Sequence, residues 1–178
     1  LIEVCEISTR PDVEAALGLV ESRVESILEG ELGYSVKEIT WFKNVIAELC
    51  HNIIDHSGER GYLAAQRYTN HREGRKFAMI SVCDLGIGIR DSLSARYDVT
   101  GWSHAKAITN AVKKTVSREA ARGLGLYVVR TICDDCDGSL HIRSGDRRVY
   151  FRGDRARIYD SGDFPGSQVS ITLYERAR

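Results

Sequence analysis

The feature that most constrains the fold is the segment 76–84 (KFAMISVCD), in which apolar side chains occupy both alternating sets of positions. Such a segment is typical of a strand that is buried on both faces near the centre of a sheet. The surrounding helix and strand patterns do not alternate strictly, so a purely parallel sheet is not expected. We therefore expect an α/β (α+β) two-layer sandwich, with a mixed β-sheet covered on one face by helices.

The other elements are predicted from apolar periodicity and from turn residues. Helices are expected over residues 9–28, 36–56, 105–114 and 124–133, and loops over 90–104 and 115–122. Further strands are expected over 2–8, 61–69, 139–143, 147–152, 156–160 and 168–174. The 178 residues fit one domain over 1–178. The sequence does not begin with Met, so it could be a piece of a longer chain.

The charge composition limits the expected partners. The 25 Lys and Arg residues balance 25 Asp and Glu residues, and zero net charge argues against general binding to nucleic acid or anionic membranes. No apolar run reaches the roughly 20 residues of a membrane helix, and no secretory signal is visible. We expect a cytoplasmic protein with no nucleic-acid partner and no membrane partner.

The five cysteines are an odd number, which favours reduced thiols. Two of them, Cys133 and Cys136, form a single CxxC pair. One such pair is weak evidence for zinc, and redox chemistry is another interpretation. Packing near the end of a helix is the interpretation that we favour.

Three segments carry the residues expected for chemistry, and the first is 48–56 (ELCHNIIDH), within a predicted helix. Because each helical residue advances by about 100°, Glu48, Asn52 and Asp55 should share one stripe. A solvated polar face would also explain this stripe. However, Asn is unfavourable inside a helix, and a carboxylate one turn before a carboxamide could hold a hard cation such as Mg²⁺ beside a base.

The second segment is 84–88 (DLGIG), at the end of the predicted central strand. A buried Asp needs a hydrogen-bond donor, and Gly86 and Gly88 would let the backbone approach a ligand. A turn at the end of the strand would also explain these residues.

The third segment is 123–126 (GLGL), which follows Arg118 and Arg122. Glycine-rich backbone at the start of a helix presents unpaired N–H groups to an anion. A loop that needs a positive φ is the alternative interpretation.

Taken in order, these segments resemble the ATPase domain shared by gyrase, heat-shock chaperones, histidine kinases and mismatch-repair proteins, the GHKL superfamily. Segment 48–56 is similar to its N box, 84–88 to its DxGxG box and 123–126 to its GLGL box. Segment 165–171 (PGSQVSI) resembles the last box, which usually carries Gly-Thr before the final strand. The resemblance covers about residues 36–175.

The resemblance implies a histidine kinase-like (Bergerat-type) fold that binds ATP, with a lid at about residues 89–122. Asn52 would coordinate a Mg²⁺ ion that bridges the phosphates, and Glu48 would be the catalytic general base. Asp84 would accept a hydrogen bond from the adenine amino group, and Ser167, in place of the usual Thr, would help hold Asp84. The other implied ATP-binding residues are Asp55, His56, Gly86, Gly88, Arg122, Gly123, Leu124, Gly125 and Leu126. Which of Lys113, Lys114, Arg118 and Arg122 reaches the γ-phosphate is left open.

The stretch ELCHNIIDHS is more similar to bacterial anti-sigma serine/threonine kinases than to histidine kinases, which often carry Lys or Arg where this chain has Asp55. About 35 residues precede the predicted helix, too few for a phosphoacceptor hairpin. The resemblance thus implies an ATP-dependent protein kinase or ATPase whose partner is an antagonist-type regulatory protein or a sigma factor. Two alternatives stay open: a histidine kinase catalytic domain with a separate phosphoacceptor domain, and an ATP-sensing switch without turnover. A homodimer is also open.

Overall fold

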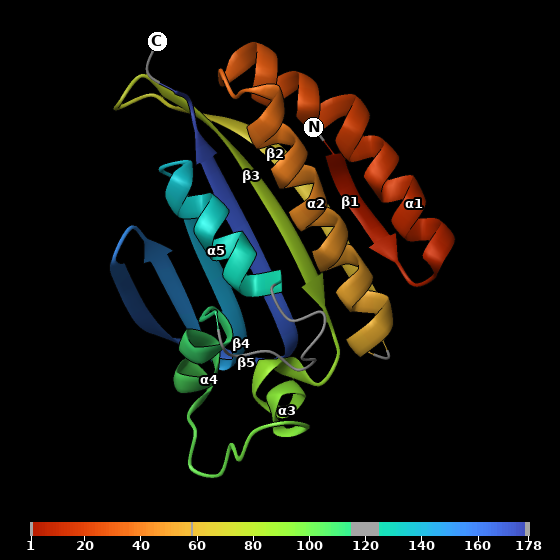
Figure 1. Ribbon diagram of the computed structural model, residues 1–178, viewed down its shortest axis with the longest axis vertical. Helices are drawn as coiled ribbons and strands as arrows, with labels where there is room; N and C mark the ends of the chain where they lie inside the picture. The colour runs from red at the N-terminus through yellow and green to blue at the C-terminus, as the bar shows by residue number, and fades with distance from the viewer. Residues whose placement is uncertain (1, 58, 115–124, 177–178) are drawn as a thin grey trace.

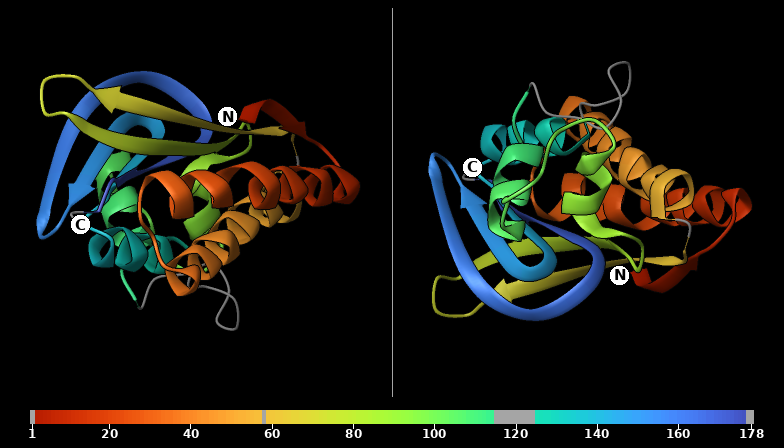
Figure 2. Two further views of the ribbon diagram at one scale, coloured as in Figure 1. Left: turned by 90° about the horizontal axis from the view of Figure 1, so that it is seen from above. Right: turned by 90° about the horizontal axis from the view of Figure 1, so that it is seen from below.

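The apolar segment forms β3 (Arg75–Asp84), the middle strand of a five-stranded sheet in the order β1-β2-β3-β5-β4. The computed structural model describes residues 2–57, 59–114 and 125–176 (Figure 1). The other strands are β1 (Ile2–Ile7), β2 (Gly61–Asn70), β4 (Ser139–Arg152) and β5 (Arg155–Tyr174). The helices α1 (Arg10–Leu19), α2 (Val36–Asn52) and α5 (Gly125–Asp135) cover one face of the sheet, as Figure 2 shows from above and below. The two-layer α+β fold predicted from the sequence is confirmed.

The sheet is antiparallel in every pairing between the described strands, so the prediction of a mixed sheet was wrong in this respect. Short turns join β2 to β3 and β4 to β5, and such turns connect antiparallel neighbours. The α5 helix returns the chain to the end of the sheet where β3 begins, so β4 runs in the direction of β3. β5 then runs back between β3 and β4 and is antiparallel to both.

The last two strands are longer than the four short ones predicted, because β4 continues through residues 144–146 and β5 through residues 161–167. Their register shifts on either side of Gly145, and the strands bend there. The outer half of the hairpin folds back beside the inner half. The ring of Tyr150 lies 6.4 Å from that of His141, and Arg152 approaches Asp137 to 3.7 Å. We call residues 147–160 the β-arm; it forms the flank of the molecule opposite α1 (Figure 1).

Three helix predictions need correction at their ends. The helix predicted to stop near Leu28 continues after α1 through two π turns, Val20–Val24 and Ile27–Glu31. The helix predicted over 36–56 is α2 followed by a π turn, Ile53–Ser57. The helix predicted over 105–114 is the shorter α4 (His104–Ala111).

The loop predicted over 90–104 is partly wrong, because α3 (Gly88–Ser94) occupies its first residues. Ile89 and Leu93, one helical turn apart, are both buried. A helix of so few residues carries too short an apolar pattern to be distinguished from a loop by periodicity. The loop predicted over 115–122 lies outside the described residues.

The position of α2 on the sheet follows from a capping box at its start and from its buried inner face. At its start, the Ser35 hydroxyl accepts a hydrogen bond from the Glu38 N–H at 3.3 Å, and the Glu38 carboxylate accepts one from the Ser35 N–H at 2.8 Å. Phe42 and Ile46 on its inner face are buried in the core.

Within the part of the chain that the structure describes, no helix is both long and apolar enough to cross a membrane.

Candidate functional site

The end of α2, the end of β3 and the start of α5 lie at the same end of the molecule (Figure 1). Ile53, at the end of α2, packs against Gly61 so closely that a Cβ at Gly61 would lie 2.7 Å from its methyl groups. Gly61 is the register partner of Asp84 on β3. The structure therefore brings the first two predicted segments to one end of the sheet.

Glu48 and Asn52 face the first residue of α5. A Cβ added to Gly125 would lie 3.4 Å from the Cγ of Glu48 and 3.6 Å from the Nδ2 of Asn52. The first N–H groups of a helix have no partner within the helix and attract anions. A carboxylate, a carboxamide and a helix N-terminus thus lie side by side, which is a suitable arrangement for a phosphate chain and its cation.

The predicted stripe does not include Asp55. Because Ile53–Ser57 is a π turn, the angular step changes after Asn52, and the Asp55 carboxylate lies 3.6 Å from the Arg10 guanidinium of α1. The α1 helix packs on the side of α2 opposite α5 (Figure 1). Asp55 therefore turns away from Gly125, while the side chain of His56 is outside what the structure describes.

Asp84 is held by two donors at the end of β3. Its Oδ1 accepts a hydrogen bond from the Gly86 N–H at 2.9 Å, and its Oδ2 accepts one from the Ser167 hydroxyl. Ser167 is also the register partner of Asp84 across β3 and β5. Each carboxylate oxygen accepts more than one hydrogen bond, so this half-buried group can still receive a donor from a ligand.

The turn after Asp84 is tightly packed against β4 and β5. Gly88 has φ +74°, and a Cβ there would lie 2.9 Å from the Ser144 Oγ and 3.1 Å from the Pro165 carbonyl oxygen. Glycine at 88 is therefore required by the protein itself, in addition to any approach of a ligand. The backbone N–H of Gly86, which lies between Asp84 and Gly88 in the sequence, donates to the Asp84 carboxylate.

Ser144, which was not among the predicted site residues, connects the two sides of this contact. Its buried hydroxyl accepts a hydrogen bond from the Ile89 N–H at 3.0 Å and donates one to the Gly166 carbonyl at 2.9 Å. The start of α3 is thereby fixed to the strand that carries Ser167. Only the tertiary fold brings residue 144 next to the turn, so no local pattern could have indicated it.

Gly166, like Gly88, is a position at which the site tolerates no side chain. A Cβ there would lie 2.0 Å from the Asp84 carbonyl oxygen and 2.7 Å from its Oδ1. Since backbone atoms cannot rotate away, we expect Gly166→Ala to lower the free energy of unfolding by about 3 kcal/mol. Urea denaturation measures this change.

The matched control for that substitution is Gly18→Ala, because Gly18 lies within α1 with nothing within 4 Å of the new methyl group. We expect this variant to be more stable by about 1 kcal/mol, from helix propensity alone. Equal effects of the two substitutions would contradict the close packing of β5 against Asp84.

The third segment and the predicted lid belong only in part to the described residues. Arg118, Arg122, Gly123 and Leu124 lie outside the described residues, whereas Gly125 and Leu126 begin α5. Within the predicted lid range, α3 and α4 pack against each other and against β4. Lys113 donates to the Asn110 side chain at 2.7 Å, and Lys114 is exposed.

The fit of a magnesium ion rests on Asn52 rather than on a cluster of acidic residues. Among the described residues, no group of three or more His, Cys, Asp or Glu side chains could hold a metal ion. Mg²⁺ commonly keeps several waters and is bound by one or two protein oxygens together with substrate phosphates. The Asn52 carboxamide carries one such oxygen and lies beside a helix N-terminus, so it fits a metal that arrives with a phosphate chain.

The CxxC pair lies in the core. Cys133 and Cys136 are both buried, at the end of α5, and burial raises the pKa of both thiols. A raised pKa reduces the thiolate that metal binding and redox exchange require. These observations support packing over the two reactive alternatives.

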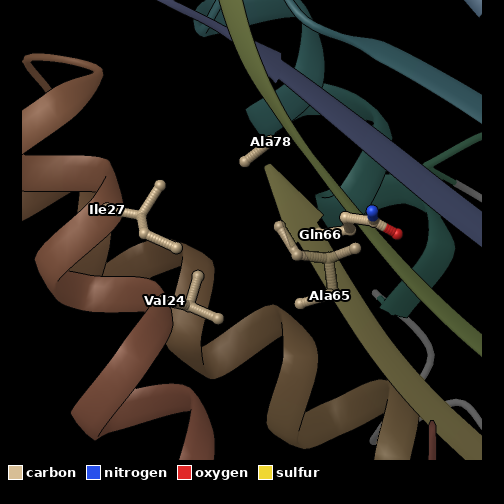
Figure 3. A pocket seen from close by; sticks show the side chains of 6 residues that line it. Val24, Ile27, Ala65, Gln66 and Ala78 are labelled. Carbon is tan, nitrogen blue, oxygen red and sulfur yellow. The ribbon is translucent and has the colours of Figure 1, made fainter. Parts of the chain in front are cut away.

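A small apolar pocket lies between the π turns and the sheet (Figure 3). Val24 and Ile27 face Ala65 and Ala78 across it, and Gln66 is its one polar lining residue. No predicted site residue lines it and it offers no charge, so it is unsuited to a nucleotide.

Sequence comparison agrees with this arrangement. None of the curated proteins is significantly similar to the chain. The family described as "Histidine kinase-, DNA gyrase B-, and HSP90-like ATPase" matches residues 37–176, which include α2, β3, α5 and β5. The chain therefore belongs to the family of histidine kinase-, DNA gyrase B- and HSP90-like ATPases.

Proposed function

We propose that this protein transfers the γ-phosphoryl group of Mg²⁺-ATP to a serine or threonine hydroxyl of a regulatory protein. Membership of the family implies ATP as the ligand. The observation that carries the proposal is the approach of Gly125 to Glu48 and Asn52, at the end of the sheet where Ser167 holds Asp84. This proximity supports the proposal that a base, a cation ligand and an anion-binding helix start act together there.

The adenine would bind at Asp84. Its carboxylate would accept a hydrogen bond from the amino group of the base, and the Ser167 hydroxyl and the Gly86 N–H keep the carboxylate oriented. Gly86 and Gly88 shape the turn beside the base. Because the donors are already in place, little ordering is required when the nucleotide binds.

The phosphates would bind between α2 and the start of α5. The N–H groups of Gly125 and Leu126, with those of Gly123 and Leu124, would donate to phosphate oxygens. Asn52 would hold Mg²⁺, which supplies positive charge to the phosphates. Asp55, His56 and Arg122 are the remaining proposed contacts, and the pairing of Asp55 with Arg10 favours a supporting role for Asp55.

Glu48 would act as the general base. It lies one helical turn before Asn52 and on the same side of α2, next to Gly125. A carboxylate there could accept the proton of an attacking hydroxyl while the phosphates are held by Asn52 and α5. Most of the rate enhancement would come from positioning and charge stabilisation.

The proposed partner is an antagonist-type protein or a sigma factor, in a cytoplasmic signalling system. Residues 89–122 would form a lid over the nucleotide, with α3 and α4 as its described parts. The competing proposals are transfer to a histidine of a phosphoacceptor domain and a switch that binds ATP without turnover. Self-association as a homodimer is compatible with each of them.

Label transfer separates these proposals. The protein is incubated with γ-labelled ATP and a fractionated extract of its source cells, and the stability of the protein-bound label is measured. We expect acid-stable label, as in phosphoserine and phosphothreonine. Acid-labile and alkali-stable label would instead indicate a histidine acceptor. Labelled phosphate alone would indicate hydrolysis, and bound but unreacted ATP would indicate a switch.

A further inference from the structure

We propose that the outer strand of the β-arm binds an acidic, extended segment of a partner protein by adding it to the sheet as a further strand. The juxtaposition that carries this inference is the backbone edge of residues 155–160, which no described strand pairs with on its outer side, beside Arg155 and Arg157, which have no carboxylate partner among the described residues. None of the predicted nucleotide-site residues belongs to the β-arm.

The edge is open along its whole length. Residues 155–160 pair with β4 on one side only, from Arg147↔Asp160 to Arg152↔Arg155. All six side chains are exposed, and Ile158 is 54% exposed. No strand in the described part of the chain pairs with the other side of this segment. An unpaired edge presents alternating N–H and C=O groups that match an extended peptide.

The charge of the β-arm differs from that of the molecule. Residues 147–160 contain five arginines and two aspartates, a net charge of +3, in a chain whose formal net charge is zero. Arg147 pairs with Asp160 at 3.2 Å and Arg152 approaches Asp137. Neither Arg155 nor Arg157 forms an ion pair with any residue that the structure describes.

One face of the β-arm concentrates this charge. In the register of the hairpin, Arg155 and Arg157 lie opposite Arg152 and Tyr150, and Tyr159 lies opposite Arg148. The Arg148 guanidinium lies 5.2 Å from the centre of the Tyr159 ring. An added strand would therefore place every second side chain beside arginine, and glutamate or aspartate at those positions would be complementary.

A peptide fits these observations better than a nucleic acid. A phosphate backbone would also be attracted by the arginines. However, it has no alternating N–H and C=O groups that could pair with the backbone of the edge strand.

The test is fluorescence anisotropy with a labelled peptide of alternating glutamate and valine, as long as the exposed edge, and no nucleotide present. We expect it to bind more tightly than the matching lysine–valine peptide. We expect the same acidic peptide, N-methylated along its whole length, to bind at least about tenfold more weakly, because it cannot form a strand. Equal binding of the methylated peptide would overturn the proposal in favour of a simple charge effect.

Matched variants locate the interaction. Arg157→Glu should weaken binding of the acidic peptide about tenfold, since an attraction becomes a repulsion. Arg72→Glu makes the same charge change at an exposed position in the turn between β2 and β3, and should leave binding within about twofold. Equal losses in both variants, or tighter binding of a single-stranded oligonucleotide than of the peptide, would contradict the assignment. Because the assay contains no nucleotide, its failure would leave the proposed ATP chemistry untouched.

Discussion

Replacing Glu48 by Gln should lower the rate of phosphoryl transfer by about a thousandfold while ATP affinity stays within about threefold. Loss of a general base typically costs a factor of about 10² to 10⁴. The glutamine keeps the size of the side chain beside Gly125, so the packing of α2 against α5 should persist. Transfer of labelled phosphate to the partner measures the rate, and calorimetric titration of ATP measures the affinity.

Glu14→Gln is the matched control, because it makes the same chemical change at an exposed position on α1, far from α5. Asn52→Ala completes the comparison, since it should reduce Mg²⁺-dependent ATP binding itself. If Glu48→Gln transferred phosphate at the parent rate, Glu48 would not be the base. If the partner response survived in Glu48→Gln and disappeared in Asn52→Ala, the protein would be a switch.

Replacing Asp84 by Asn should weaken ATP binding by about a hundredfold, or about 2.7 kcal/mol. In the variant, the Gly86 N–H would donate to the one carbonyl oxygen of the new side chain. The NH₂ group of that side chain would then point towards Ser167 and the adenine amino group. Two donors would then face each other. Calorimetric titration of the variant with ATP gives the loss.

Inosine triphosphate provides a sharper readout, because it carries a carbonyl oxygen where adenine carries the amino group. We expect Asp84→Asn to reverse the preference of the parent protein for ATP over this nucleotide. Asp154→Asn, an exposed change in the turn between β4 and β5, should alter neither affinity. An unchanged ATP affinity in Asp84→Asn would exclude Asp84 from the adenine contact.

The sequence predicted the features that depend on local patterns. The two-layer fold follows from the strand β3, which is apolar on both faces, and from the helical spacing of α2. The order of the motifs indicated that the ends of α2 and β3 belong to one site. Glu48 and Asn52 follow the predicted stripe because α2 is regular up to Asn52.

The features that the sequence did not predict depend on tertiary contacts. A π turn redirects Asp55 to Arg10, and no rule of residue spacing anticipates such a turn. Ser144 reaches the turn after Asp84 only because β4 passes beside it. The bend that creates the β-arm depends on register shifts around Gly145, whereas the sequence predicted two separate strands over 139–143 and 147–152.

The most direct test of the central claim is calorimetric titration of ATP into the parent protein, with and without Mg²⁺, repeated on Asn52→Ala. The claim is that the ends of α2 and β3 and the start of α5 form one Mg²⁺-ATP site. We predict one ATP per chain, tighter binding with Mg²⁺, and loss of that Mg²⁺ effect in Asn52→Ala. No binding by the parent protein, or a Mg²⁺ effect that persists undiminished in Asn52→Ala, would contradict the account.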